Sequence, residues 1–503
     1  MRPPSSWRRS LVASALGNGW IALIQIAFAP VYIAILGVEA YGLIGAFAFL
    51  LALFWVLDSG VAQAISREVA RALAGSRGAG EVRGIIRSVE VLIVGTAIVV
   101  VALVFAAAGS IVDLWLRLDS LESSSVVAAF RILGVQLAFR LFVDLYRAVL
   151  AGAQDLVWLN SVAAAFATLR GAGVLPVLFL WPRIEAFFAF QAVATGLEAC
   201  ILGWRARSVL PQSGRATFSL AALGEIHRFS VGATLVTLLC LVLGQADRAV
   251  LPGTIPLAEF GGYALSASVA TALGMIVGPF ATTARLKLNE LVARGDAEGV
   301  TEAFHRVAQW VTLAAAPAAL VLAAFAEPLL LLWTRNAILS AAAAPLLAWL
   351  AIAGLLNACS AIPYVLPLAH GRTRDLVRIH AVALALFVPS LYIGSTGYGA
   401  IAAAIACVVV AALELLVSPL LLRGILPARE VSRWVARDVL GPVSAAGFAS
   451  VSVLLAAPSG ADGLTTTCWI VGAYLASLGA AALALPDLRR SRAVSLTPPP
   501  EGH

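Results

Sequence analysis

Three charged side chains interrupt an otherwise apolar stretch of the sequence, residues 126–150. Arg140, Asp144 and Arg147 are separated by four and three residues, so an α-helix would place all three on one face. The next apolar stretch contains Arg170 about halfway along. Because guanidinium groups bind phosphate and diphosphate in bidentate fashion, arginines that share one aqueous cavity would suit an anionic ligand. Arg140, Arg147 and Arg170 are therefore the predicted ligands of an anionic head group.

Carboxylates lie singly in three other apolar stretches, at Asp58, Glu198 and Glu414. A charge near the middle of a membrane costs about 2.5–3.5 kcal/mol even on the lenient insertion scale, so such residues usually have a partner or a function. These carboxylates are predicted to pair with the arginines or to bind a coupling cation. Asp144, which lies within the arginine face, is a fourth candidate of the same kind.

A purely structural role stays open for the same charges. Asp144 and its neighbours could join helices to one another, with the long side chain of Arg147 reaching toward the polar surface. Asp247 and Arg248 lie near the end of the apolar stretch 229–251, where the burial of charge costs less. An ion pair between these two residues is the favoured interpretation there.

Composition places these charges in a membrane protein. The 503 residues are 61% hydrophobic and 12% charged, and the mean hydropathy is +0.95. A soluble globular protein is about 45–50% apolar and about 25% charged. The sequence therefore predicts an all-α polytopic membrane protein.

Apolar stretches of sufficient length occur fourteen times, which predicts about fourteen transmembrane helices, since a helix needs about 20 residues to cross roughly 30 Å of hydrocarbon. They are residues 11–36, 43–66, 86–108, 126–150, 156–181, 184–204, 229–251, 260–284, 307–326, 340–369, 377–395, 400–422, 436–457 and 465–485. Within the fifth stretch, Gly171, Gly173 and Pro176 are predicted to loosen the helix beside a cavity.

The positions of Arg and Lys predict the orientation, because basic residues beside membrane spans are retained in the cytoplasm. Most of the 34 basic residues fall in segments that lie inside when the N-terminus is cytoplasmic. An even number of spans then places both termini in the cytoplasm. The formal net charge of +7 is spread over these loops beside an anionic leaflet, so it does not indicate nucleic-acid binding.

Cysteine and histidine indicate neither a metal centre nor a disulfide framework. The five cysteines lie singly in apolar stretches without metal-ligand spacing, and no function is assigned to the five histidines. The sequence has no phosphate-binding Gly-rich loop with Lys and no His-Glu-x-x-His motif. We therefore expect no catalytic residues, no metal and no cofactor, and no ATP hydrolysis by this chain.

Two hairpins of the sequence are related by an internal repeat. Shifting the segment VEAYGL (38–43) by 220 residues places Glu39 on Glu259 and Gly42 on Gly262. The agreement predicts an internal duplication, as many transporters show.

Several short motifs, in order along the chain, resemble those of a known family. They are LGVEAYGL (36–43), LDSG (57–60) with the basic REVAR (67–71), QADR (245–248) with FGGY (260–263), and EPLLLLW (327–333). Together they extend over about residues 10–425. The sequence resembles the oligosaccharide flippases, the O-antigen and exopolysaccharide branch of the multidrug/oligosaccharidyl-lipid/polysaccharide exporter superfamily.

The resemblance implies two pseudo-symmetric six-helix lobes, residues 1–225 and 226–425, followed by two additional helices and a cytoplasmic tail in 426–503. It implies an alternating-access flippase that moves a polyprenyl-diphosphate-linked oligosaccharide across the bacterial inner membrane for polysaccharide biosynthesis. The implied partners are that lipid-linked glycan, the lipid bilayer, a polysaccharide polymerase and glycosyltransferases. Related flippases use cavity arginines, and the arginine candidates named above match this use by helix position and charge alone.

Two rival functions stay open. A cation-coupled multidrug exporter of the same superfamily would depend on the carboxylates Asp58, Glu198 and Glu414 in place of the arginines. An outer-leaflet polysaccharide polymerase or ligase would be an enzyme, and such enzymes usually need a substantial outer loop. The longest predicted outer loop, residues 109–125, is short for that purpose.

Overall fold

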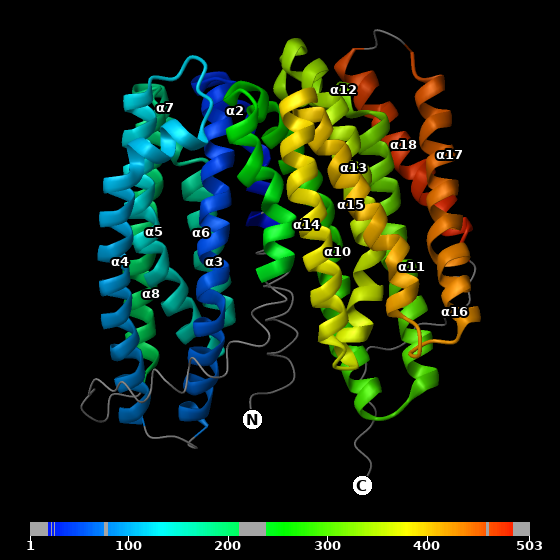
Figure 1. Ribbon diagram of the computed structural model, residues 1–503, viewed down its shortest axis with the longest axis horizontal. Helices are drawn as coiled ribbons and strands as arrows, with labels where there is room; N and C mark the ends of the chain where they lie inside the picture. Colours follow the sequence, from blue (N-terminus) through cyan, green and yellow to red (C-terminus); the bar gives the residue numbers. More distant parts are fainter. Residues whose placement is uncertain are drawn as a thin grey trace. The chain divides into compact units, whose positions relative to one another are not determined.

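The computed structural model describes residues 19–21, 23–24, 26–74, 79–210, 238–458 and 462–485. For residues 55–61 and 79 it describes the backbone but not the side chains. Over these ranges the chain is almost entirely helical and contains no β-strand (Figure 1). The predicted all-α class is therefore confirmed for the described residues.

The helices follow one another with short connections. They are α2 (Ala29–Leu36), α3 (Val38–Leu73), α4 (Ala79–Trp115), α5 (Ser123–Gly152), α6 (Leu156–Gly171), α7 (Val174–Leu180), α8 (Ile184–Val209), α10 (Leu257–Ala293), α11 (Ala297–Ala324), α12 (Ala326–Thr334), α13 (Ala337–Ala369), α14 (Thr373–Tyr398), α15 (Ala400–Leu421), α16 (Ala428–Arg433), the π-helix η1 (Trp434–Leu440), α17 (Gly441–Ala456) and α18 (Gly463–Leu483). Residues 238–254 are also helical.

Eleven helical segments in the described ranges are long and apolar enough to cross a membrane. Each overlaps one of the predicted spans, and together they show a multi-pass membrane protein. The other three predicted spans, 11–36, 43–66 and 229–251, include residues whose placement or side chains lie outside the description. The total of fourteen and the cytoplasmic location of both termini stay predictions.

The chain divides by contact into two compact units. The first comprises Met1–Val269 and Leu376–Ala406, and the second comprises Ala270–Asp375 and Cys407–His503. This division by contact does not test the lobes predicted at 1–225 and 226–425, which rest on the repeat, so those boundaries stay a prediction. Each unit is described below by itself.

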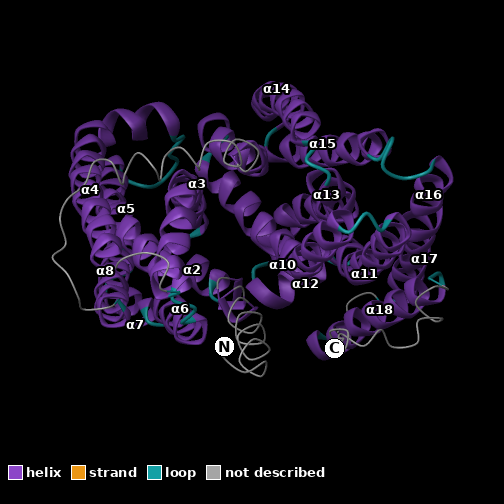
Figure 2. Cartoon of the chain, turned by 90° about the horizontal axis from the view of Figure 1, so that it is seen from below, coloured by secondary structure: helices purple, strands orange, loops and turns teal. Residues whose placement is uncertain are grey.

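Helix α5 is the central helix of the first unit. It packs against α8, α4 and α3, and these helices run roughly parallel to one another (Figure 1). Seen end-on, α5 and α8 lie side by side, with α6 also in contact with α8 (Figure 2). Because α5 has neighbours on several sides, the charged side chains along it face other helices as well as solvent or lipid.

Helices α3 and α10 cross in backbone contact near their first residues, within the first unit. A Cβ atom on Gly42 would collide with the carbonyl oxygen of Leu257, and one on Gly261 would collide with that of Val38. Only glycine therefore fits at this crossing without movement of the backbone. The partner of Gly42 in α10 is Gly261, one residue before the Gly262 that the repeat aligns with it.

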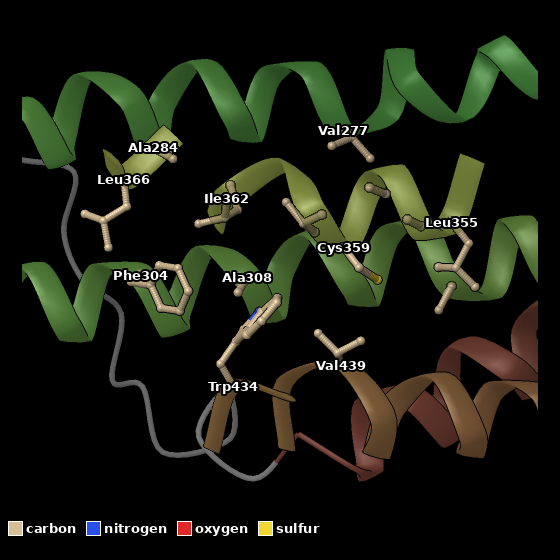
Figure 3. Packing of buried hydrophobic residues seen from close by; sticks show 14 of the residues in the cluster. Val277, Ala284, Phe304, Ala308, Leu355, Cys359, Ile362, Leu366, Trp434 and Val439 are labelled. Carbon is tan, nitrogen blue, oxygen red and sulfur yellow. The ribbon is translucent and has the colours of Figure 1, made fainter. Parts of the chain in front are cut away.

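The core of the second unit surrounds α11. Figure 3 shows Phe304 and Ala308 of α11 facing Trp434 of η1, with Ile362 and Leu366 of α13 on the other side. Trp434 is 1% exposed, so the π-helix buries a large side chain against α11. This hydrophobic packing holds the segment from α16 to α17 against α11.

Candidate functional site

Two of the predicted arginines converge on one carboxylate in the first unit. Arg147 Nη2 of α5 lies 2.7 Å from Glu198 Oε1, and Arg170 Nη1 of α6 lies 2.5 Å from Glu198 Oε2. Each oxygen of this α8 carboxylate thus accepts from a different guanidinium. The sequence marked all three residues as candidates, but it did not indicate that one carboxylate joins two arginines.

Glycines allow α8 to approach α5 closely on both sides of this carboxylate. A Cβ on Gly196 would press against the ring of Phe139, and one on Gly203 would press against the ring of Tyr146. Small residues at a helix interface allow backbones to approach, which is common between membrane helices. The approach brings Glu198 within reach of Arg147.

The third helix of the site ends at the arginine that it contributes. Arg170 lies in the last turn of α6, where the helix dipole favours a positive charge. A turn at residues 172–173 separates α6 from α7, so the predicted loosening after Arg170 is observed. Tyr32 donates to the carbonyl oxygen of Gly171 at 2.7 Å, and Gln191 donates to that of Arg170 at 3.1 Å. These bonds satisfy carbonyls that the helix end leaves without partners.

The burial of the cluster is uneven. The side chain of Glu198 is 0% exposed, whereas those of Arg147 and Arg170 are 29% and 22% exposed. The carboxylate is therefore shielded from solvent, whereas the two arginine side chains are partly exposed. A buried carboxylate is tolerated only when it is paired, and here both of its oxygens are.

Arg140 belongs to the same face of α5 but has a different partner. Its Nε donates to Asp144 Oδ2 at 3.0 Å, one helical turn away. The side chain of Arg140 is 26% exposed and that of Asp144 is 10% exposed. The predicted face therefore exists, and it is divided into an Arg140–Asp144 pair and the Arg147–Glu198–Arg170 cluster. Whether any of these arginines binds a ligand stays a prediction.

The structure does not test the roles predicted for Asp58 and Glu414. The side chain of Asp58 lies outside the described residues, although its backbone is in α3. Glu414 is half-buried on α15 and belongs to the second unit. Their predicted roles in pairing or coupling stay untested.

The predicted ion pair between Asp247 and Arg248 does not form in the described chain. Tyr263 of α10 donates to Asp247 Oδ2 at 2.6 Å instead, and Asp247 is 8% exposed. Residues 238–254 form a helix, and the Asp247 carboxylate is directed to α10 rather than to its neighbour in sequence. The correction follows from the packing of this helix against α10, which supplies Tyr263 as the partner.

The first turn of α3 holds a carboxylate, Glu39, that belongs to the sequence repeat and to the motif LGVEAYGL (36–43). Glu39 accepts from the backbone nitrogens of Asp119, Ser120 and Leu121 at 2.7, 2.8 and 3.1 Å, and from Ser120 Oγ at 2.5 Å. Burial raises the pKa of the Glu39 carboxyl, but these hydrogen bonds stabilise its charged form more, so the pKa lies below its ordinary value. Glu39 thereby fixes the loop between α4 and α5.

The repeat-related glutamate has a comparable role. Glu259 lies in the first turn of α10 and accepts from the backbone nitrogen of Ala400 at 2.6 Å. Both aligned glutamates therefore hold the backbone of a connection between helices. The sequence repeat had aligned these two glutamates with each other.

A buried polar group in the second unit was not found from the sequence. Asp438 of η1 lies 2.5 Å from His305 Nδ1 and accepts from Gln309 Nε2 at 2.8 Å. Asp438, His305 and Gln309 are 0%, 4% and 2% exposed. The signal available was the four-residue spacing of His305 and Gln309, which puts both on one face of a helix that continues into the predicted span 307–326.

The long apolar helices define a multi-pass membrane protein, and its first unit contains a cluster of two arginines on one buried carboxylate. In structure it is similar to a lipid II flippase, MurJ, in an inward closed conformation, with a TM-score of 0.73 and 13% identity over 96% of this chain and 99% of that chain.

It is also similar to an inward-facing multidrug resistance MATE family transporter of the MOP superfamily, with a TM-score of 0.65 and 14% identity over 82% of this chain and 99% of that one. A third similar structure is a ligand complex of the MATE multidrug transporter DinF-BH, with a TM-score of 0.61 and 13% identity over 84% and 95% of the two chains. At these identities the likeness shows a shared fold.

Sequence comparison gives the family. The family model described as polysaccharide biosynthesis protein matches residues 8–286. A search of curated protein sequences finds no match. The chain belongs to the polysaccharide biosynthesis protein family, and the family resemblance of the motifs is confirmed.

Proposed function

We propose that this protein is an alternating-access flippase that moves a polyprenyl-diphosphate-linked oligosaccharide from the cytoplasmic to the outer leaflet of the bacterial inner membrane. The family, which concerns polysaccharide biosynthesis, supports the pathway. The fold shared with a lipid II flippase supports the type of transport. Glycosyltransferases would supply the substrate and a polysaccharide polymerase would consume it.

The convergence of Arg147 and Arg170 on Glu198 is the observation that carries the proposal. Each guanidinium has five N–H donors in a planar fork and contacts Glu198 through one nitrogen. Arg147 Nε is buried, so terminal guanidinium nitrogens are the donors we expect to bind phosphate oxygens, and both side chains are partly exposed. Two guanidiniums held by one carboxylate lie close enough together to bind adjacent phosphates of one diphosphate.

The proposed cycle uses the lobes 1–225 and 226–425, with 426–503 as an accessory helix pair and both termini in the cytoplasm. The diphosphate and sugars enter the inward-open protein beside the arginines, while the polyprenyl tail stays in the lipid. Rocking of the lobes then exposes the head group to the outer side. A ligand drives such a change only if its affinity for the two states differs, so consumption of the glycan outside or an ion gradient supplies direction.

Translocation of a labelled polyprenyl-diphosphate oligosaccharide in proteoliposomes tests the proposal. Arg147→Ala and Arg170→Ala should each reduce the initial rate at least tenfold. Arg205→Ala is the matched control, because Arg205 pairs with Asp155 at 2.8 Å in the same unit, outside the cluster. Full activity in both cluster variants, or absence of glycolipid transport by wild type, would contradict the proposed function.

A cation-coupled multidrug exporter is the second candidate, since MATE transporters share the fold. Such an exporter was predicted to use Asp58, Glu198 and Glu414. Glu198 already pairs with two arginines, which disfavours cation binding at that position. Efflux of an organic cation that Asp58→Asn or Glu414→Gln abolishes, with no glycolipid transport, would favour the exporter.

A further inference from the structure

Glu198 is more deeply buried than the two arginine side chains that it joins. It is fully buried, and each of its oxygens contacts a different arginine, Arg147 or Arg170. An anionic ligand that approaches the accessible side of the cluster therefore meets guanidinium before carboxylate. The ligand and Glu198 nevertheless compete for the same two positive charges, because both are anions and the guanidiniums are shared between them.

The charges around the cluster do not balance those of a bound diphosphate. The cluster itself consists of two guanidiniums, Arg147 and Arg170, and one carboxylate, Glu198. The Arg140–Asp144 pair on α5 adds no net charge. One net positive charge remains. A diphosphate that links a lipid to a sugar carries two negative charges, so the occupied site has an excess negative charge while Glu198 keeps its place. Such an excess is unfavourable at low dielectric.

We propose that Glu198 is an exchangeable counter-ion, which pairs with Arg147 and Arg170 in the empty site and yields them to the diphosphate of the substrate. This inference rests on the proposed function. In the empty state the carboxylate reduces the cost of holding two adjacent positive charges within a membrane. In the occupied state its competition weakens binding, so that the head group is released on the far side.

Glu198→Gln separates the charge of this side chain from its shape. Glutamine keeps a similar size and one carbonyl acceptor, but it no longer competes as an anion. The dissociation constant of inorganic pyrophosphate should fall at least tenfold, measured by isothermal titration calorimetry on the full-length protein in detergent. In the translocation assay both KM and kcat should fall, because tighter binding of the head group slows its release.

Two further variants make the comparison specific. Asp155→Asn is the matched control, since it removes another arginine-paired carboxylate of the same unit outside the cluster, and it should leave pyrophosphate affinity unchanged. Glu198→Asp keeps the charge but shortens its reach, so its affinity should lie between those of wild type and Glu198→Gln. This variant keeps the test decisive if the glutamine variant does not fold.

The outcomes distinguish the counter-ion from the proposed function. Tighter pyrophosphate binding by folded Glu198→Gln supports the exchange, even when binding by wild type is too weak to detect. Equal or weaker binding by folded Glu198→Gln and Glu198→Asp, beside measurable binding by wild type, shows that Glu198 only positions the arginines and overturns the exchange. If none of these proteins binds pyrophosphate and wild type moves no glycolipid, both the exchange and the flippase function are wrong.

Discussion

Asp438→Ala should destabilise the second unit by about 3–5 kcal/mol. The side chain is 0% exposed and has two partners on successive turns of α11. His305 Nδ1 lies 2.5 Å from Oδ2, and Gln309 Nε2 donates to Oδ1 at 2.8 Å. A buried hydrogen bond to a charged group contributes about 1.5–3 kcal/mol, and truncation removes this partner from both buried side chains.

Denaturant-induced unfolding of the purified protein in a single detergent measures this effect. Asp462→Ala is the control, because Asp462 also accepts a hydrogen bond, from Thr465 N at 3.3 Å, but lies exposed at the start of α18. The loss of stability in Asp462→Ala should be much smaller than in Asp438→Ala. A double-mutant cycle with His305→Ala then isolates the coupling between Asp438 and His305, which should exceed about 1 kcal/mol for groups in direct contact.

Two results would refute this reasoning about Asp438. One is a loss of stability below about 1 kcal/mol, the range of ordinary surface substitutions and weak exposed pairs. The other is strict additivity of the Asp438 and His305 substitutions. Either result would mean that the Asp438 carboxylate does not stabilise the packing of η1 against α11. The hydrophobic contact between Trp434 and Phe304 would then be sufficient for that packing.

Three further predictions concern the first unit. Gly42→Ala should cost about 1–3 kcal/mol of stability by forcing α3 away from α10, whereas Gly95→Ala on open α4 should be neutral or slightly stabilising; equal effects in unfolding experiments would contradict the close crossing. The stability that the depressed pKa of Glu39 provides is complete above its ordinary value of 4.5 and is lost as the pH falls through the lower folded value. Unfolding measured between about pH 3 and 6 should therefore depend less on pH in Glu39→Gln, and an unchanged profile would exclude this role. Arg170→Lys keeps the charge but loses the planar fork, so pyrophosphate should bind more weakly, and unchanged affinity would indicate a point-charge site.

The spans could be predicted from the sequence because apolar length is a direct consequence of bilayer thickness. Their ends could not. The predicted span 260–284 lies within α10, which continues to Ala293, and the predicted span 307–326 starts ten residues after α11 does. Helical hydrogen bonding continues into polar sequence, and Asp296 caps α11 by accepting from Gly299 N at 2.8 Å. Hydropathy detects only the part of a helix that is apolar.

The site was predictable to the extent that it is local. The spacing of Arg140, Asp144 and Arg147 gave one face of a helix, and the structure has that face. The pairing with Glu198, 51 residues from Arg147, depends on how α8 packs and rotates against α5. No periodicity within one helix contains that information. The Asp247 prediction was wrong for the related reason that its partner, Tyr263, is on another helix.

Two of the buried carboxylates in the described residues show how the proposed site differs from a structural contact. Asp438 and Glu198 are both fully buried, and each joins two side chains from neighbouring helices. The partners of Asp438 are 4% and 2% exposed, so no ligand can reach them without unfolding of the core. The arginine side chains that contact Glu198 are 29% and 22% exposed. Substitution of Asp438 should therefore change stability with little effect on ligand affinity, whereas substitution of Glu198 by glutamine should change affinity first.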